Sequence, residues 1–207
     1  MSRDGPHNQH IRIRIAQLAA QLMAEHGIRD YALAKRKAAR QLGVSSTNNL
    51  PCNEEIDEEL KAYLTLFEAE THERDIDAMR RQAIDVMDVL ARFKPVLIGG
   101  LVQGAASRHS DIELEVYSDS SKEFEQFLLN LDIAFKSEER RNGSYFTLYA
   151  EPVDVLVRIQ PVQSLQSGAI RAAPDARRRI TAEQLRQMIV AESAVRETEK
   201  PQDQGII

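Results

Sequence analysis

An alternating run of acidic and aliphatic residues lies near the middle of this 207-residue chain. Asp111, Glu113 and Glu115 occupy every second position of the segment DIELEV. In a β-strand, residues two apart point to the same face and lie about 6–7 Å apart, so the acids would form a row. Such a row repels itself unless divalent cations lie between the carboxylate oxygens. The pattern therefore predicts either a metal-binding strand or a sheet with one solvated face.

Two further features could complete a metal-dependent site. Gly99 and Gly100 precede the acidic strand and would let the backbone approach a ligand closely, with N–H groups available to phosphate oxygens. Asp154 interrupts the otherwise apolar segment 153–159. If that segment is a strand beside the acidic strand, Asp154 adds a third carboxylate, and three carboxylates can bind two Mg²⁺ ions.

These residues resemble the signature of the nucleotidyltransferase superfamily, which includes DNA polymerase beta and the minimal nucleotidyltransferases. That signature is a hydrophobic strand, Gly-Ser or Gly-Gly, another Gly, Ser-Asp-hydrophobic-Asp/Glu, and a later Asp on a different strand. The resemblance covers residues 93–161, about a third of the chain, and the chain as a whole also resembles a group of proteobacterial proteins. The matching residues are Gly99, Gly100, Gly104, Ser110, Asp111, Glu113 and Asp154.

The resemblance implies transfer of a nucleoside monophosphate from a nucleoside triphosphate to a hydroxyl group, with Mg²⁺ or Mn²⁺ as cofactor. The implied metal ligands and catalytic residues are Asp111, Glu113 and Asp154. The implied nucleotide-binding residues are Gly99, Gly100, Gly104 and Ser110, with Arg108 as a candidate source of positive charge from the loop. The acceptor is left open among a protein, an RNA and a small molecule.

The chain departs from the family pattern in ways that affect phosphate binding. Gly100 stands where many members have Ser, and Leu101 and Gln103 stand where minimal members often have Arg. Glu113 replaces the commoner Asp and is longer by one methylene group. A second hypothesis is therefore a catalytically degenerate nucleotidyltransferase fold that acts as a nucleotide-sensing or protein-interaction module.

A third hypothesis starts from the segment KRKAARQLGVSS, residues 35–46, which has the spacing of a DNA-binding helix-turn-helix. A recognition helix should follow, but Pro51 would end it early and Asn49 stands where a buried aliphatic residue is needed. The same basic run could instead be a solvated helix face or a strip that meets a polyanionic acceptor.

Composition limits the class of protein. The net charge is −5, with 8 Lys/Arg against 3 Asp/Glu in residues 1–50 and 12 against 23 in residues 51–160. This balance argues against a dedicated DNA-binding protein. The single Cys52 cannot form an internal disulfide, and residues 1–27 contain no apolar run typical of a signal peptide or membrane span. We expect a soluble cytoplasmic protein.

Hydrophobic periodicity predicts an α+β fold: a helical N-terminal region followed by a small mixed sheet with a nucleotidyltransferase-like core and flanking helices. The predicted regions are 1–92 (helical), 93–163 (core), 164–195 (loop and helix) and 196–207 (disordered tail). Helices are predicted over 11–27, 31–43, 53–67, 75–90, 121–131 and 181–193. Strands are predicted over 95–99, 111–118, 144–150 and 153–159. Asp30 is expected to cap the second helix, and Thr181 with Gln184 to form a capping box at the last.

Overall fold

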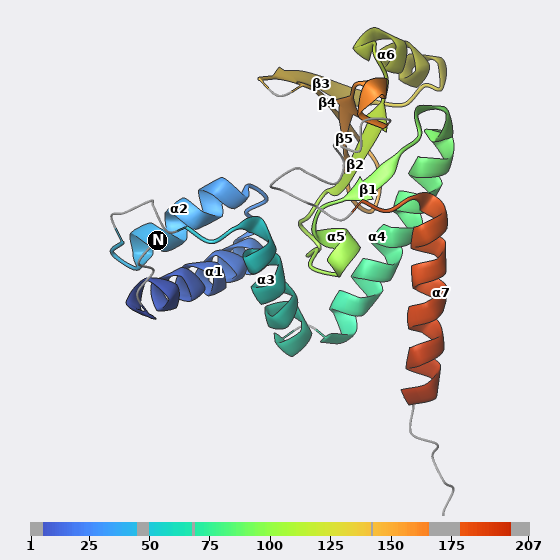
Figure 1. Ribbon diagram of the computed structural model, residues 1–207. Coiled ribbons are helices and arrows are strands. Elements are labelled where there is room, and N and C mark those ends of the chain that lie inside the picture. The colour runs from blue at the N-terminus through green and yellow to red at the C-terminus, as the bar shows by residue number, and fades with distance from the viewer. Residues whose placement is uncertain (1–5, 45–49, 68, 142, 166–178, 200–207) are drawn as a thin grey trace, which may run out of the picture.

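The computed structural model describes residues 6–44, 50–67, 69–141, 143–165 and 179–199. It confirms the α+β fold, with helices at the N-terminus and a five-stranded mixed sheet after them (Figure 1). The buried residues form two separate hydrophobic clusters. One cluster belongs to the first three helices, and the other lies between the sheet and the remaining helices.

The first cluster holds together a helical unit of α1 (Pro6–His26), α2 (Tyr31–Gln41) and α3 (Asn53–Phe67). As predicted, Asp30 caps α2 by accepting hydrogen bonds from the backbone N–H groups of Ala32 and Leu33. Residues four apart on the inner faces pack together because they lie on one side of a helix. They include Ile15, Ala19, Ala34, Ala38, Ile56, Leu60 and Leu64.

The second cluster is built on the sheet, whose strand order is β1-β2-β5-β4-β3. The strands are β1 (Val96–Ile98), β2 (Ile112–Tyr117), β3 (Phe135–Arg140), β4 (Gly143–Leu148) and β5 (Val155–Gln160). Strands β2 and β5 pair in parallel, and every other neighbouring pair is antiparallel. The acidic strand and the strand expected over 153–159 therefore lie side by side, which is the condition for a three-carboxylate site, but β5 begins at Val155, so Asp154 precedes the strand.

Helices cover one face of this sheet. They are α4 (Ala69–Val89), α6 (Ser121–Asn130) and α7 (Ala182–Glu199), with α7 packed along α4 (Figure 1). The apolar side of α4, with Ile76, Met79 and Ala83, belongs to the sheet cluster. The predicted helical region 1–92 thus contributes to both hydrophobic clusters, because α1–α3 form the first and α4 packs on the sheet in the second.

Several predicted boundaries differ from those of the structure. Strand β3 was not predicted, because its segment FKSEER is almost wholly exposed and so lacks an apolar alternation. The capping box at α7 is present, but this helix continues to Glu199, past the predicted start of the disordered tail at residue 196. Residues 45–49, part of the helix-turn-helix hypothesis, lie outside the described residues.

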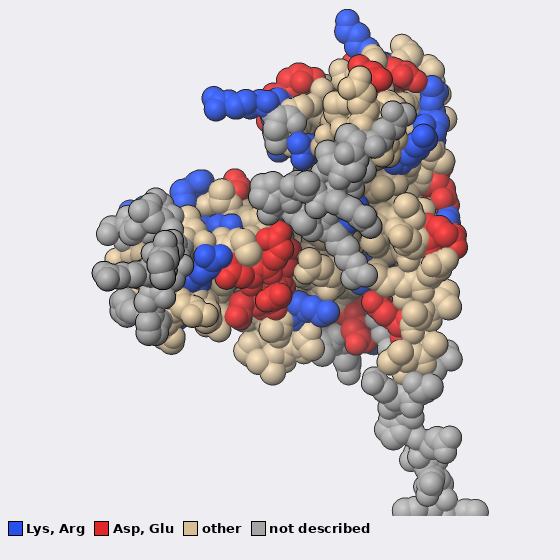
Figure 2. Space-filling view, viewed as in Figure 1, with Lys and Arg blue, Asp and Glu red and all other residues tan. Residues whose placement is uncertain are grey.

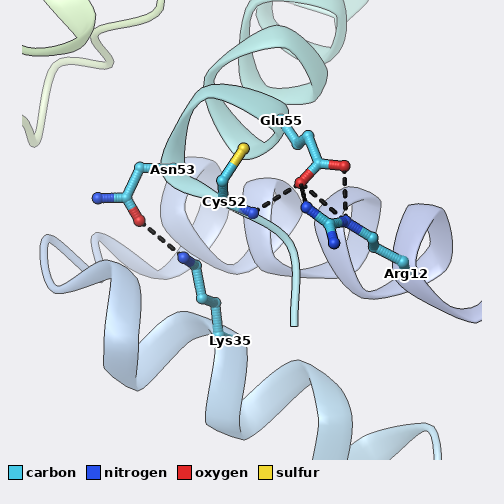
Figure 3. Close-up of polar contacts among 5 residues, drawn as sticks. All are labelled: Arg12, Lys35, Cys52, Asn53 and Glu55. Carbon is cyan, nitrogen blue, oxygen red and sulfur yellow. Dashed lines mark hydrogen bonds and ion pairs between the residues drawn. The ribbon is translucent and has the colours of Figure 1, made fainter. Parts of the chain in front are cut away.

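Polar contacts fix the start of α3 against the two helices before it (Figure 3). The Arg12 guanidinium donates to both carboxylate oxygens of Glu55 at 2.7–3.0 Å, and the backbone N–H of Cys52 donates to the same carboxylate at 2.6 Å. Lys35 donates to the side-chain oxygen of Asn53 at 2.7 Å. These bonds tie the end of the loop before α3 to α1 and α2.

Glu55 should make the stability of the helical unit depend on pH. Its hydrogen bonds from Arg12 lower the pKa of the carboxyl from its ordinary 4.5 to about 2. The carboxylate therefore stabilises the fold above pH 4.5, and this contribution is lost as the pH falls toward 2. Glu55 is about a third exposed, so solvent screens the pair and we expect Glu55→Gln to cost only about 1 kcal/mol at pH 7.

Urea unfolding monitored by circular dichroism at pH 7, 4 and 2.5 measures this contribution. The difference between wild type and Glu55→Gln should shrink steadily as the pH falls. A difference that is the same at all three pH values would show that Glu55 is not held as a low-pKa carboxylate.

Candidate functional site

Three of the predicted site residues share one face of the sheet. In the β2–β5 register, Ile112 is opposite Val155, and the backbone N–H of Ile112 donates to the Asp154 carbonyl at 3.0 Å. Asp111 and Asp154 immediately precede this pair, so they lie side by side at the starts of two adjacent parallel strands. Glu113, two residues after Asp111, points to the same face.

Asp111 is half-buried and forms an ion pair with Arg29, whose Nη1 lies 2.5 Å from Oδ1. Burial raises the pKa of the Asp111 carboxyl, Arg29 acts against that rise, and the nearby charge of Asp154 adds to it. Arg29 lies in the short connection between α1 and α2. The helical unit therefore supplies the cation that holds the first predicted metal ligand.

Glu113 lies against the glycine turn that links β1 to the one-turn helix α5 (Gly100–Gln103). A Cβ atom at Gly99 would be 3.0 Å from the Glu113 carboxyl carbon, and Gly99 has a φ of +80° that disfavours other residues. A Cβ at Gly100 would be 3.3 Å from the Ala105 carbonyl oxygen. The backbone therefore passes close to the Glu113 carboxylate, and a serine at position 100 would press on the Ala105 carbonyl.

The other predicted nucleotide-binding residues are not all at this place. Ser110 lines the cavity described below, and its hydroxyl accepts a hydrogen bond from the Ser107 N–H. Gly104 ends α5 and faces a different cavity, beside Lys61 and Arg80. Arg108 is exposed, and it is not among the described residues that line the cavity next to the carboxylates.

A cavity of about 780 Å³ lies between the helical unit and the carboxylate face of the sheet. Asp111 and Glu113 form part of its lining on the sheet side, together with Leu156 and Tyr145. The side of the cavity that the helical unit forms is rich in positively charged side chains. The cations in the lining are Arg29, Lys35 and Arg36 from the helical unit and Arg140 from β3.

Sequence reasoning did not assign these four cations to the site. The run that contains Lys35 and Arg36 was recognised as basic, but its position over the carboxylates depends on how two separate cores pack. Arg29 and Arg140 belong to no motif, and only the tertiary structure brings them to the cavity.

A further contact holds the helical unit beside the sheet. A Cβ at Gly27 would lie 3.3 Å from the His109 ring, so the end of α1 packs on the loop that leads to Asp111. Asp30 of the helical unit and Arg140 of β3 also line the same cavity. The helical unit therefore forms a wall of the cavity.

Glu115, the last acid of the alternating run, has a different environment. It is 2% exposed, and its carboxylate accepts from Arg179 at 2.7 Å, with Arg158 at 3.6 Å. Glu115 is thus paired with arginines within the fold and, unlike Asp111 and Glu113, is not among the described residues that line the cavity. Figure 2 shows where charges gather on the surface: acidic side chains lie over α3, beside basic side chains from the helical unit.

Within the described ranges, no three His, Cys, Asp or Glu side chains converge closely enough to hold a metal ion. Asp111, Glu113 and Asp154 share a face, but one oxygen of Asp111 is bound to Arg29. Divalent metal binding at this face would therefore require the carboxylates to move closer together, in competition with Arg29 for Asp111.

Comparison of the chain with protein-family models, curated proteins and solved structures gave no match. Among the helices that the structure describes, none combines the length and apolar character needed to cross a membrane. The functional assignment consequently depends on the geometry of the cavity and its carboxylates.

Proposed function

We propose that the protein is a divalent-metal-dependent nucleotidyltransferase that moves a nucleoside monophosphate from a nucleoside triphosphate to a hydroxyl group. One observation carries the proposal. Asp111 and Asp154 begin adjacent parallel strands, with Glu113 on the same face against a glycine turn. Carboxylates from two strands beside a close backbone approach are the components that phosphoryl transfer with Mg²⁺ requires.

Asp111, Glu113 and Asp154 offer only carboxylate oxygens, the donors that Mg²⁺ and Mn²⁺ prefer, but their side chains do not converge as a ligand group, so binding would require them to move closer together. Burial and the charge of Asp154 both raise the pKa of Asp111, and a cation would relieve this unfavourable environment. When bound, the ions would neutralise charge on the transferring phosphoryl group. The carboxylates of the chain would position these ions and lie close to the attacking hydroxyl.

The cavity is compatible with a nucleotide. Small-molecule sites commonly have volumes of about 300–1,000 Å³, and the cavity at the carboxylates measures about 780 Å³. Tyr145 adds an aromatic ring to its lining. A nucleoside triphosphate could thus place its phosphates near Asp111 and its sugar and base in the rest of the space.

A specific observation favours the second candidate, a degenerate fold that binds nucleotide without transferring it. Asp111 is already paired with Arg29, and Leu101, at a position where minimal members often have Arg, is a buried apolar side chain that offers no charge to phosphate. Such a module would bind a nucleotide in the same cavity and release it unchanged.

Transfer of label from the four α-³²P nucleoside triphosphates separates the two candidates. Candidate acceptors are the protein itself, bulk transfer RNA and a pool of small hydroxyl compounds. We expect slow incorporation with Mg²⁺ or Mn²⁺ and none after chelation with EDTA, because the charge on the phosphates would then be unneutralised. Nucleotide binding without incorporation into any acceptor would favour the sensing module instead.

A further inference from the structure

The wall of the cavity that faces the carboxylates is positively charged. We call Arg29, Lys35, Arg36 and Arg140 the cationic wall; all four line the cavity with Asp111 and Glu113. Asp30 is the other acidic residue among the described lining residues, and its side chain accepts hydrogen bonds from two backbone N–H groups of α2. The described lining thus holds four cations and three carboxylates.

Each cation of the wall is held differently. Arg36 is exposed, and no ion pair joins it to another residue in the described part of the chain. Lys35 is anchored by its bond to Asn53, and Arg140 stacks on the Tyr145 ring at 4.5 Å and pairs with Glu138. Arg29 pairs with Asp111 across the two units of the molecule. The wall thus combines anchored cations with one, Arg36, that is available to a ligand.

We infer that the cationic wall binds the phosphate groups of the nucleotide, so that nucleotide binding is divided between the sheet and the N-terminal helical unit. This inference rests on the proposed function. Helix α5, directly beside the carboxylates, carries no cation, since its residues are Gly100 to Gln103. Among the described residues that line the cavity, the positive charge that a triphosphate requires lies across from the carboxylates, on the helical unit and on β3.

Arg29 has a distinct part in this arrangement. Its guanidinium forms an ion pair with Asp111. If a divalent ion were bound at Asp111, like-charge repulsion would favour release of the guanidinium, and Arg29 would then be placed to pair with a phosphate oxygen in the same cavity. Arg29 would thus compete with the metal for Asp111 and bind the anion that arrives with the metal.

This exchange of partners gives Arg29→Ala two effects of opposite sign. Removing the competing cation should raise the affinity for Mn²⁺ alone several-fold. Removing a phosphate ligand should lower the affinity for magnesium tripolyphosphate about tenfold, as expected for a hydrogen bond to a charged group. If Arg29 only docked the helical unit on the sheet, both affinities would fall.

Calorimetric titration of the full-length chain tests the inference. The probes are Mn²⁺ alone and magnesium tripolyphosphate, which carries the phosphates without a base. The variants are Arg29→Ala and Arg36→Ala, with Lys37→Ala as matched control, because Lys37 is exposed on the same helix and is not part of the described cavity lining. Circular dichroism establishes that each variant folds.

We expect Arg36→Ala to bind magnesium tripolyphosphate about threefold to tenfold more weakly, with Mn²⁺ affinity unchanged, and Lys37→Ala to match wild type. Equal tripolyphosphate affinity in wild type and Arg36→Ala would overturn the cationic wall, even if Arg29→Ala does not fold. These affinities are measured independently of label transfer. If wild type transfers label but Arg36→Ala binds tripolyphosphate as tightly as wild type, the inference about the cationic wall fails and the proposed activity stands. If Arg36→Ala binds tripolyphosphate more weakly but wild type transfers no label, the proposed activity fails and the cationic wall stands.

Discussion

Replacing Asp111 with Asn should lower Mn²⁺ affinity at least about tenfold and reduce nucleotidyl transfer at least about a hundredfold. Changes in the residues that support metal ligands typically cost about 10–100-fold in affinity, and the loss of a direct ligand should cost no less. Transfer should fall further, because phosphoryl transfer depends on positioning and charge neutralisation rather than on covalent chemistry. Asn keeps the size of Asp and removes only the charge.

Asp154→Asn should reproduce this result, because Asp154 lies beside Asp111 on the neighbouring strand. Asp85→Asn is a suitable control, since Asp85 is an exposed acid on α4. Mn²⁺ titration and label transfer from the same preparations provide the measurements. Wild-type metal affinity in both Asp111→Asn and Asp154→Asn would remove the proposed metal site.

Most of the sheet side of the site could be predicted from sequence, because local patterns determine it. The alternation around Asp111 and Glu113 identifies a strand with one acidic face, and the glycines before it indicate a close backbone approach. Asp154 could be identified as a third candidate carboxylate because it is the one acid in an otherwise apolar segment, residues 153–159. Parallel pairing then brings Asp154 beside Asp111, as the β2–β5 register confirms.

The helical side of the site could not be predicted, since it depends on how two separate cores pack together. Arg29 lies 82 positions before Asp111, and no periodicity connects them. Strand β3, which brings Arg140 to the cavity, is an exposed edge strand, and exposed edges carry little hydrophobic signal. Long-range electrostatic partners of this kind become visible only when the tertiary structure is known.

The alternating acids also turn out to have more than one role. Sequence spacing makes Asp111, Glu113 and Glu115 equivalent, yet Glu115 is buried beside two arginines while Glu113 lies at the glycine turn. The difference comes from Ile180, which bridges to Leu97 on the edge of β1 and so places Arg179 against β2. One end of the strand therefore faces the cavity, and the other is part of the folded core.

This division predicts that Glu115→Ala will destabilise the protein by about 1–3 kcal/mol, because it removes a buried carboxylate that accepts hydrogen bonds from Arg179 and Gln160 and lies 3.6 Å from Arg158. Glu113→Ala is a matched control from the same strand face, and we expect it to cost less than about 1 kcal/mol while weakening Mn²⁺ binding. Glu115→Ala should leave Mn²⁺ affinity at the wild-type value. The chain has no tryptophan, so urea unfolding is best monitored by far-ultraviolet circular dichroism, with Mn²⁺ titration in parallel. Equal stability losses in the two variants, or a loss of Mn²⁺ affinity in Glu115→Ala, would contradict the separation of a structural acid from the proposed metal ligands.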